Sequence, residues 1–143
     1  MALAERNLRA NGVDNARVAK LSAEEFSAAA TGARDFSRLH RAGVDLGNGN
    51  RSLAEALATD HTLRFDRLST LFVDPPRAGL DETCVDLAAT FDTVVYVSCN
   101  PETLARDVAA LAKTHDLTRL AAFDQFPYTH HLECGVLLER RLR

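Results

Sequence analysis

Two short apolar runs, each ended by a polar loop and followed by a helix-like pattern, constrain the fold of this chain more than any other feature. Residues 71–73 (LFV) lead into Asp-Pro-Pro, and residues 94–97 (VVYV) lead into Ser-Cys-Asn-Pro. Helical patterns follow over residues 82–89 and residues 102–113. This order predicts successive β-α-β units, and therefore an α/β fold in which both runs are fully buried parallel strands.

The C-terminal part departs from this alternation. Residues 117–123 and residues 132–138 are strand-like, with no helix-length segment between them. Because parallel neighbours need a long crossover, we expect these last strands to form an antiparallel pair at one edge of the sheet. Binding sites in such sheets lie at the carboxyl ends of the parallel strands.

The N-terminal part predicts a helix, a strand and a second helix. Residues 2–10 have apolar side chains at helical spacing, and the Asn-Gly that follows is a typical stop. Residues 16–21 are typical of a short strand. Ser22 and Glu25 have the spacing of a capping box, which predicts a helix from residue 23 to about residue 30.

The segment of about residues 44–68 differs in composition, and we interpret it as an insertion. It contains Gly-Asn-Gly-Asn at residues 47–50 and an Ala- and Leu-rich piece at residues 53–58, typical of a short surface helix. The glycine stretch has the letters of a nucleotide-binding loop, but no apolar strand precedes it. A surface turn is therefore the favoured interpretation.

Composition limits the class of protein. With 143 residues the chain has material for one domain, residues 1–143. No apolar run is long enough for a membrane span, so we expect a soluble, cytoplasmic protein. The net charge of -3 gives no basic footprint for nucleic acid. Three cysteines without a CxxC pair favour neither a disulfide framework nor a structural zinc site, so at least one thiol is free.

Two polar loops after the apolar runs are candidate sites. Asp74 lies at a strand end before two prolines, which stiffen a loop suited to a ligand with N–H donors; a plain strand terminator is the alternative. Cys99 lies just before a predicted helix, whose dipole favours a thiolate nucleophile; a buried structural cysteine is the alternative. Cys84, inside a helical pattern, is interpreted as structural.

The connection before the last strand is unusually rich in functional groups for its length. His130 and His131 are adjacent, which is not the spacing of a zinc pair, so we expect no metal. Glu133 is either a solvated strand residue or a carboxylate facing the site. Cys134 points to the opposite face and is expected to lie in the core.

Residues 72–81 (FVDPPRAGLD), residues 97–104 (VSCNPETL) and residues 123–138 together resemble the RNA 5-methyluridine methyltransferases, in that family's order and spacing. The last stretch resembles the tRNA-specific branch more than the ribosomal RNA branches. The opening segment also matches, notably residues 23–26 (AEEF). The resemblance covers nearly the whole chain apart from the insertion.

The resemblance implies S-adenosylmethionine-dependent methylation of uracil C5 in the T loop of tRNA. The family counterparts of Cys99 and Glu133 are the catalytic nucleophile and the proton acceptor, and the counterpart of Asp74 helps bind S-adenosylmethionine. The implied fold is a Rossmann-like methyltransferase domain. Phe126, Tyr128 and His130 are candidates for stacking on the target base or on its neighbours.

Family members carry an RNA-binding region, two further strands and a glycine-rich cofactor loop before the matching part. We therefore expect this chain to be the C-terminal part of the catalytic domain, incomplete at its N-terminal side. Alternatives are a ribosomal RNA uracil-5-methyltransferase, a truncated non-catalytic remnant, and an amino-group methyltransferase suggested by Asp-Pro-Pro alone.

Overall fold

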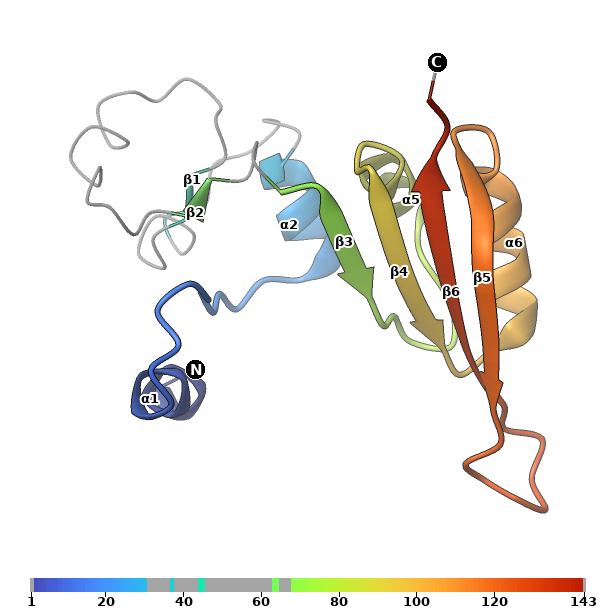
Figure 1. Ribbon diagram of the computed structural model, residues 1–143, viewed down its shortest axis with the longest axis horizontal. Coiled ribbons are helices and arrows are strands. Elements are labelled where there is room, and N and C mark those ends of the chain that lie inside the picture. The colour runs from blue at the N-terminus through green and yellow to red at the C-terminus, as the bar shows by residue number, and fades with distance from the viewer. Residues whose placement is uncertain (1, 31–36, 38–43, 46–62, 65–67, 143) are drawn as a thin grey trace. The chain divides into compact units, whose positions relative to one another are not determined.

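The computed structural model describes residues 2–30, 37, 44–45, 63–64 and 68–142 (Figure 1). The chain divides into two compact units, Met1–Arg67 and Leu68–Arg143. The assignment of all 143 residues to one domain stays a prediction.

The first unit contains the two predicted helices. Helix α1 spans Ala2–Ala10. Gly12 follows in the turn, where its φ of +67° carries no steric cost because glycine has no side chain. Helix α2 spans Ala23–Ala30. The Glu25 N–H donates to Ser22 Oγ at 3.1 Å and the Ser22 N–H to Glu25 Oε2 at 3.0 Å, which confirms the capping box.

The strand predicted at residues 16–21 is wrong. Those residues form no helix or strand, and in the described part of the chain they belong to neither sheet. Local pattern indicates an extended backbone, but a strand also requires a partner to complete its hydrogen bonds. The predicted insertion lies mostly outside the described residues, and the turn at 47–50 and the helix at 53–58 lie wholly outside them. Its described pieces are β1 (Val44–Asp45) and β2 (Leu63–Arg64), which pair in parallel.

The second unit is a four-stranded sheet with two helices, ordered β3-β4-β6-β5 (Figure 1). Its elements are β3 (Thr70–Val73), α5 (Glu82–Ala88), β4 (Thr93–Ser98), α6 (Pro101–Leu111), β5 (His115–Phe123) and β6 (Glu133–Arg140). Strands β3 and β4 are parallel, while β6 runs antiparallel to both β4 and β5. The α/β prediction and the terminal antiparallel pair are confirmed.

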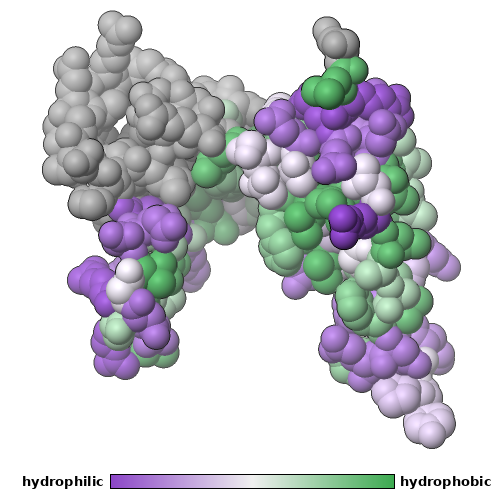
Figure 2. Space-filling model, in the orientation of Figure 1, coloured by the Kyte–Doolittle hydropathy of each residue, from purple (hydrophilic) through white to green (hydrophobic). Residues whose placement is uncertain are grey.

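Helices α5 and α6 cover one face of this sheet, and the core lies beneath them (Figure 1). Along β4 alternate residues are buried, among them Val94 and Tyr96, both fully enclosed. The opposite face is more open: Phe72 of β3 is 64% exposed, and Figure 2 shows apolar surface over the sheet. The prediction of two fully buried strands is therefore wrong, because within this unit helices pack on one face only.

Among the described residues, none of the helices has the length and hydropathy that crossing a lipid bilayer requires.

Candidate active site at the strand ends

The topology brings three sequence-predicted residues to one end of the sheet. Asp74 follows the last residue of β3, and Cys99 follows the last residue of its parallel neighbour β4. Glu133 is the first residue of β6. Because Ser98 of β4 pairs with Cys134 of antiparallel β6, Cys99 and Glu133 are the next residues outward on neighbouring strands.

Cys99 sits in a tight connection between β4 and α6. It is a free cysteine of intermediate burial, whereas Cys84 and Cys134 are buried as predicted. On one side of it, Ser98 Oγ accepts a hydrogen bond from the Asn100 N–H at 3.1 Å. On the other side, the Asn100 side chain accepts from the Glu102 N–H at 3.1 Å and caps α6. The backbone around the thiol is thus held from both directions.

The loop after β3, residues 74–80, is tied to the same helix. Asn100 Nδ2 donates to the Arg77 carbonyl at 3.0 Å, and Thr103 Oγ1 donates to it at 3.2 Å. One Arg106 nitrogen donates to the Ala78 carbonyl at 3.0 Å and to the Leu80 carbonyl at 3.1 Å. The segments that carry Asp74 and Cys99 therefore share one support, the first two turns of α6.

Sequence reasoning missed Asp107, which completes this support from inside the fold. Its side chain is 2% exposed, and it accepts hydrogen bonds from Tyr96 Oη at 2.7 Å and from the Leu80 N–H at 2.8 Å. Burial, followed by the bond to Asp107, raises the pKa of Tyr96 above its ordinary value. A signal was present in the sequence, since Asp107 falls on the buried stripe of α6 between Leu104 and Leu111.

Two carboxylates at this end of the sheet, Asp74 and Glu133, lack a partner among the described residues. Asp74 is exposed and Glu133 is half-buried, and in the described part of the chain neither side chain forms a hydrogen bond or an ion pair. Asp81, by contrast, accepts a bond from the Cys84 N–H at 2.7 Å as the N-cap of α5, which lowers the pKa of Asp81. Asp74 and Glu133 are free to accept bonds from a ligand.

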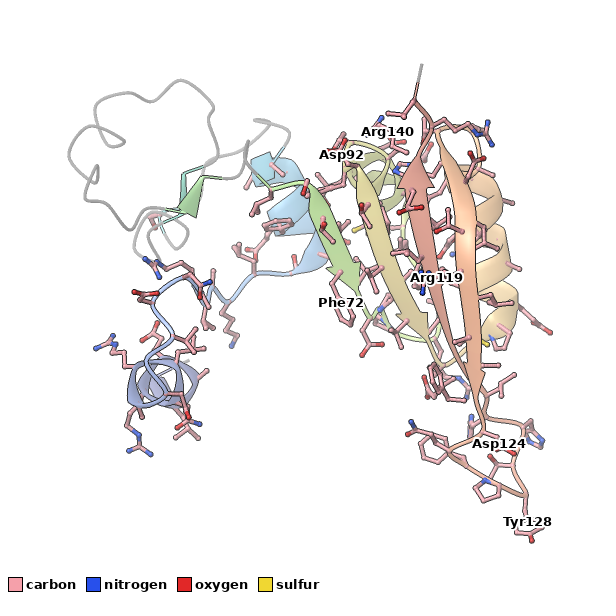
Figure 3. The ribbon with its side chains drawn as sticks, viewed as in Figure 1. Phe72, Asp92, Arg119, Asp124, Tyr128 and Arg140 are labelled. Atoms are coloured by element: carbon pink, nitrogen blue, oxygen red, sulfur yellow. The ribbon has the colours of Figure 1, made fainter. Side chains whose placement is uncertain are left out.

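The connection between β5 and β6 projects past this end of the sheet, and Figure 3 labels Asp124 and Tyr128 within it. Tyr128 is fully exposed, with a φ of +67° that is rare for a residue bearing a side chain. Phe126 is 48% exposed and meets the His131 ring edge-on. Within the described residues no group of three or more His, Cys, Asp or Glu could hold a metal ion.

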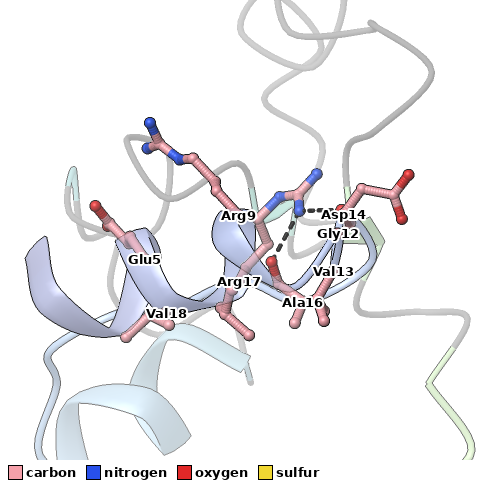
Figure 4. A pocket seen from close by; sticks show the side chains of 9 residues that line it. Glu5, Arg9, Gly12, Val13, Asp14, Ala16, Arg17 and Val18 are labelled. Atoms are coloured by element: carbon pink, nitrogen blue, oxygen red, sulfur yellow. Dashed lines mark hydrogen bonds between the residues drawn. The ribbon is translucent and has the colours of Figure 1, made fainter.

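The first unit has a pocket of its own at the end of α1 (Figure 4). There the Arg17 guanidinium donates to the backbone carbonyls of Asp14 and Ala16. The pocket contains none of the three predicted site residues. Its lining consists of Glu5, Leu8, Arg9, Gly12, Val13, Asp14, Ala16, Arg17 and Val18.

This α/β sheet thus carries an aspartate, a cysteine and a glutamate together at one set of strand ends. Over residues 1–141 the chain matches the family model described as tRNA (Uracil-5-)-methyltransferase. The chain belongs to this family.

Curated relatives agree with the family match. Two proteins named tRNA/tmRNA (uracil-C(5))-methyltransferase, from Yersinia pestis (strain Pestoides F) and Yersinia pseudotuberculosis serotype O:1b (strain IP 31758), are each 47% identical over 141 residues. The match covers 99% of this chain and 33% of each relative. This chain therefore spans about a third of the length of those relatives.

A solved structure is also similar: Pyrococcus abyssi tRNA (uracil-54, C5)-methyltransferase in complex with S-adenosyl-L-homocysteine. Its identity is 37% and its TM-score 0.45, over 62% of this chain and 24% of that one.

Proposed function

We propose that this chain supplies the catalytic groups for S-adenosylmethionine-dependent methylation of uracil C5 in the T loop of tRNA. The observation that supports the proposal best is the grouping of Asp74, Cys99 and Glu133 at one end of one sheet. The 47% identity to proteins named tRNA/tmRNA (uracil-C(5))-methyltransferase supports the substrate class.

Cys99 acts as the nucleophile. Its thiolate adds to C6 of the uracil ring, which moves the electron pair of the C5–C6 double bond toward C5 and the C4 carbonyl. C5 then has enolate character and accepts a methyl group. Unassisted, C5 is too weak a nucleophile for this step.

Glu133 acts as the proton acceptor. After methylation, C5 carries both the new methyl group and its original proton. The Glu133 carboxylate removes that proton, and the returning electron pair expels the Cys99 thiolate from C6, which restores the ring. A carboxylate without a protein partner is suited to this task because no existing hydrogen bond has to be broken.

Asp74 fits a role in cofactor binding. Its carboxylate is exposed at a strand's carboxyl end, next to two prolines that restrict the backbone, and it has no partner in the described residues. It is therefore able to accept hydrogen bonds from amino or hydroxyl groups of a ligand. S-adenosylmethionine, when bound, supplies the methyl group from its sulfonium centre.

A trapping experiment tests the proposal. The purified chain is incubated with S-adenosylmethionine and a tRNA transcript containing 5-fluorouridine, alone and together with the upstream two-thirds of a relative. Because Glu133 cannot remove fluorine from C5, turnover stops at the covalent stage, and we expect a protein–RNA band on a denaturing gel. Cys99→Ala should abolish the band, and Cys84→Ala should retain it.

Three other outcomes have defined meanings. A band with a ribosomal RNA transcript and none with tRNA would mean that the substrate is ribosomal RNA and that the proposed tRNA substrate is wrong. A band only in the presence of the upstream part would mean that the groups are correct but act within a larger assembly. The absence of a band in every combination would overturn the proposal.

A further inference from the structure

The buried carboxylate of Asp107 occupies a helix position where an apolar side chain would normally pack. Its neighbours on the buried stripe of α6 are Leu104 and Leu111. Burying a charge is costly unless each oxygen is hydrogen-bonded. The partners of Asp107 therefore indicate why an acid lies there.

Both oxygens of Asp107 are used, and one of them reaches the 74–80 loop. Oδ2 accepts from the Leu80 N–H at 2.8 Å and from Tyr96 Oη at 2.7 Å. Oδ1 accepts from Arg106 Nε at 2.8 Å. Arg106 in turn donates to the Ala78 and Leu80 carbonyls. The Asp107–Arg106 pair thus bonds to one N–H group and two carbonyl groups of the loop backbone. None of these bonds depends on a side chain of the loop.

The loop is shaped to receive this pair at Gly79. Its φ is +77°, and a Cβ added there would come within 2.5 Å of Asp107 Oδ2 and 2.7 Å of an Arg106 nitrogen. Only glycine allows the backbone to approach so closely in this conformation. The loop backbone therefore fits the Asp107–Arg106 pair both in shape, at Gly79, and in its hydrogen-bonding groups.

We infer that Asp107 and Arg106 are positioning residues, which hold the 74–80 loop against α6 so that Asp74 is set relative to Cys99. The inference rests on the proposed function for the roles of Asp74 and Cys99. Neither Asp107 nor Arg106 is assigned a contact with substrate. Their effect passes through the loop backbone, and through the bond from Asn100 Nδ2 to the Arg77 carbonyl, which links the loop to the residue after Cys99.

The Arg77–Ala78 peptide bond offers a direct test, because trypsin cleaves after arginine and the Arg77 carbonyl is held by α6. Arg106→Met removes the bonds to the loop carbonyls while keeping an apolar stem. Arg141→Met is a matched control: Arg141 is 50% exposed and ion-paired to Asp116 at 2.7 Å, and Arg106 is 57% exposed and paired at 2.7 Å. Arg141 also donates to a carbonyl, that of Ala112.

We expect Arg106→Met to speed cleavage after Arg77 by about tenfold or more, since cleavage follows the population of the opened loop and hydrogen bonds from charged donors are lost. Arg141→Met should change that rate by less than about twofold. Arg106→Lys, which keeps a single charged donor, should recover part of the protection. Intact-mass analysis identifies the cut, and far-UV circular dichroism shows whether each variant is folded.

A second readout measures the site itself. Alkylation of Cys99 by iodoacetamide should be faster in Arg106→Met, and formation of the 5-fluorouridine adduct should be slower. Arg141→Met should change neither rate. Asp107→Asn, which keeps one oxygen for Leu80 and Tyr96, should lie between Arg106→Met and the unmodified chain in all three assays.

The outcomes separate the positioning role from the proposed function. Unchanged cleavage after Arg77 in a folded Arg106→Met variant would overturn the positioning role. Faster cleavage with unchanged Cys99 alkylation would also overturn it, because the loop would then move without affecting the cysteine. If no variant forms an RNA adduct, the proposed function fails, while cleavage and alkylation still decide whether the pair holds the loop.

Discussion

The two ends of the β3–β6 sheet use their polar side chains in opposite ways. One end, here called the anchored end, includes Phe91, Asp92, His115 and Arg140, whose side chains or backbone carbonyls bond to one another. The other, the open end, includes Asp74, Cys99 and Glu133. Figure 3 labels Asp92 and Arg140 at the first end and Asp124, just past β5, at the second.

At the anchored end, side chains close the fold. His115 is fully buried, and its Nε2 bonds to the Phe91 carbonyl at 2.9 Å while Nδ1 bonds to Thr114 Oγ1 at 2.8 Å. Because a carbonyl only accepts, Nε2 carries the proton. Arg140 donates to the same carbonyl and to that of Ala89. These bonds join the end of α5 to the start of β5 and the end of β6.

At the open end hydrogen bonds also hold the backbone, but the candidate site carboxylates take no part in them. Asn100 and Asp81 cap helices there, whereas the side chains of Asp74 and Glu133 form no hydrogen bond or ion pair with the described residues. The anchored end thus uses its polar side chains in internal bonds, whereas under the proposed function Asp74 and Glu133 keep theirs for a ligand. Mutations at the two ends should therefore separate stability from activity.

The largest effect on stability is expected from His115→Ala at the anchored end. The substitution removes two hydrogen bonds and leaves a cavity in a fully buried position. We expect a loss of about 2–4 kcal/mol in the free energy of unfolding, measured by urea denaturation with constant m-value. A loss under about 1 kcal/mol would mean that this end contributes less than its contacts imply.

Arg140→Met should have the next largest effect. It removes charge-assisted bonds to the carbonyls of Phe91 and Ala89 but keeps the apolar stem, so we expect a loss of about 1–2 kcal/mol. Asp92→Asn is the control. Its ion pair with Arg140 is 3.7 Å long and its side chain is 72% exposed, so its removal should cost less than about 0.5 kcal/mol. Equal losses in both variants would contradict the assignment to the carbonyl bonds.

Local patterns in the sequence predict the local parts of this structure well. The capping box at Ser22 and Glu25, the helices α5 and α6, and the position of Cys99 at a strand end all follow from short-range spacing. Short-range spacing does not show which distant residues will pair or pack with a segment. The strand expected at 16–21 has none, and the exposure of Phe72 depends on a face of the sheet that this unit leaves uncovered.

The same reason explains why the support that Asp107 gives to the 74–80 loop was missed. Asp107 and Leu80 are 27 positions apart, and their contact exists only because α6 returns across the sheet beside the 74–80 loop. The acid among apolar positions of α6 marks Asp107 as unusual, but its partners require the tertiary structure.

Asp81→Ala tests a carboxylate that lies near the open end but, unlike Asp74 and Glu133, accepts a hydrogen bond within the protein, from the Cys84 N–H. Loss of the α5 N-cap should cost about 1 kcal/mol at pH 7. The Cys84 N–H lowers the pKa of Asp81 below its ordinary 3.8, so the stabilisation is present above pH 3.8 and is lost as the pH falls through the lowered pKa. The stability difference from the unmodified chain should therefore shrink in acid. Asp81→Asn, which caps without titrating, should show no loss at pH 7.

The smallest effects on stability are expected at the open end itself. Asp74→Asn and Glu133→Gln remove charges that have no partner in the described chain, so each should change the free energy of unfolding by less than about 0.5 kcal/mol. Their effects on chemistry should be large and different. Asp74→Asn should weaken binding of S-adenosylmethionine, measured as a smaller rise in the thermal midpoint at saturating cofactor.

Glu133→Gln should stop the reaction after methyl transfer, because the C5 proton can no longer be removed and Cys99 cannot leave. Under conditions where 5-fluorouridine traps the unmodified chain, this variant should form a covalent adduct with tRNA containing ordinary uridine. Glu139→Gln is a suitable control, since Glu139 lies on the same strand at the anchored end. If Glu133→Gln instead turned over normally, the proton acceptor would have to be another group, and the lack of a partner at Glu133 would not indicate a catalytic role.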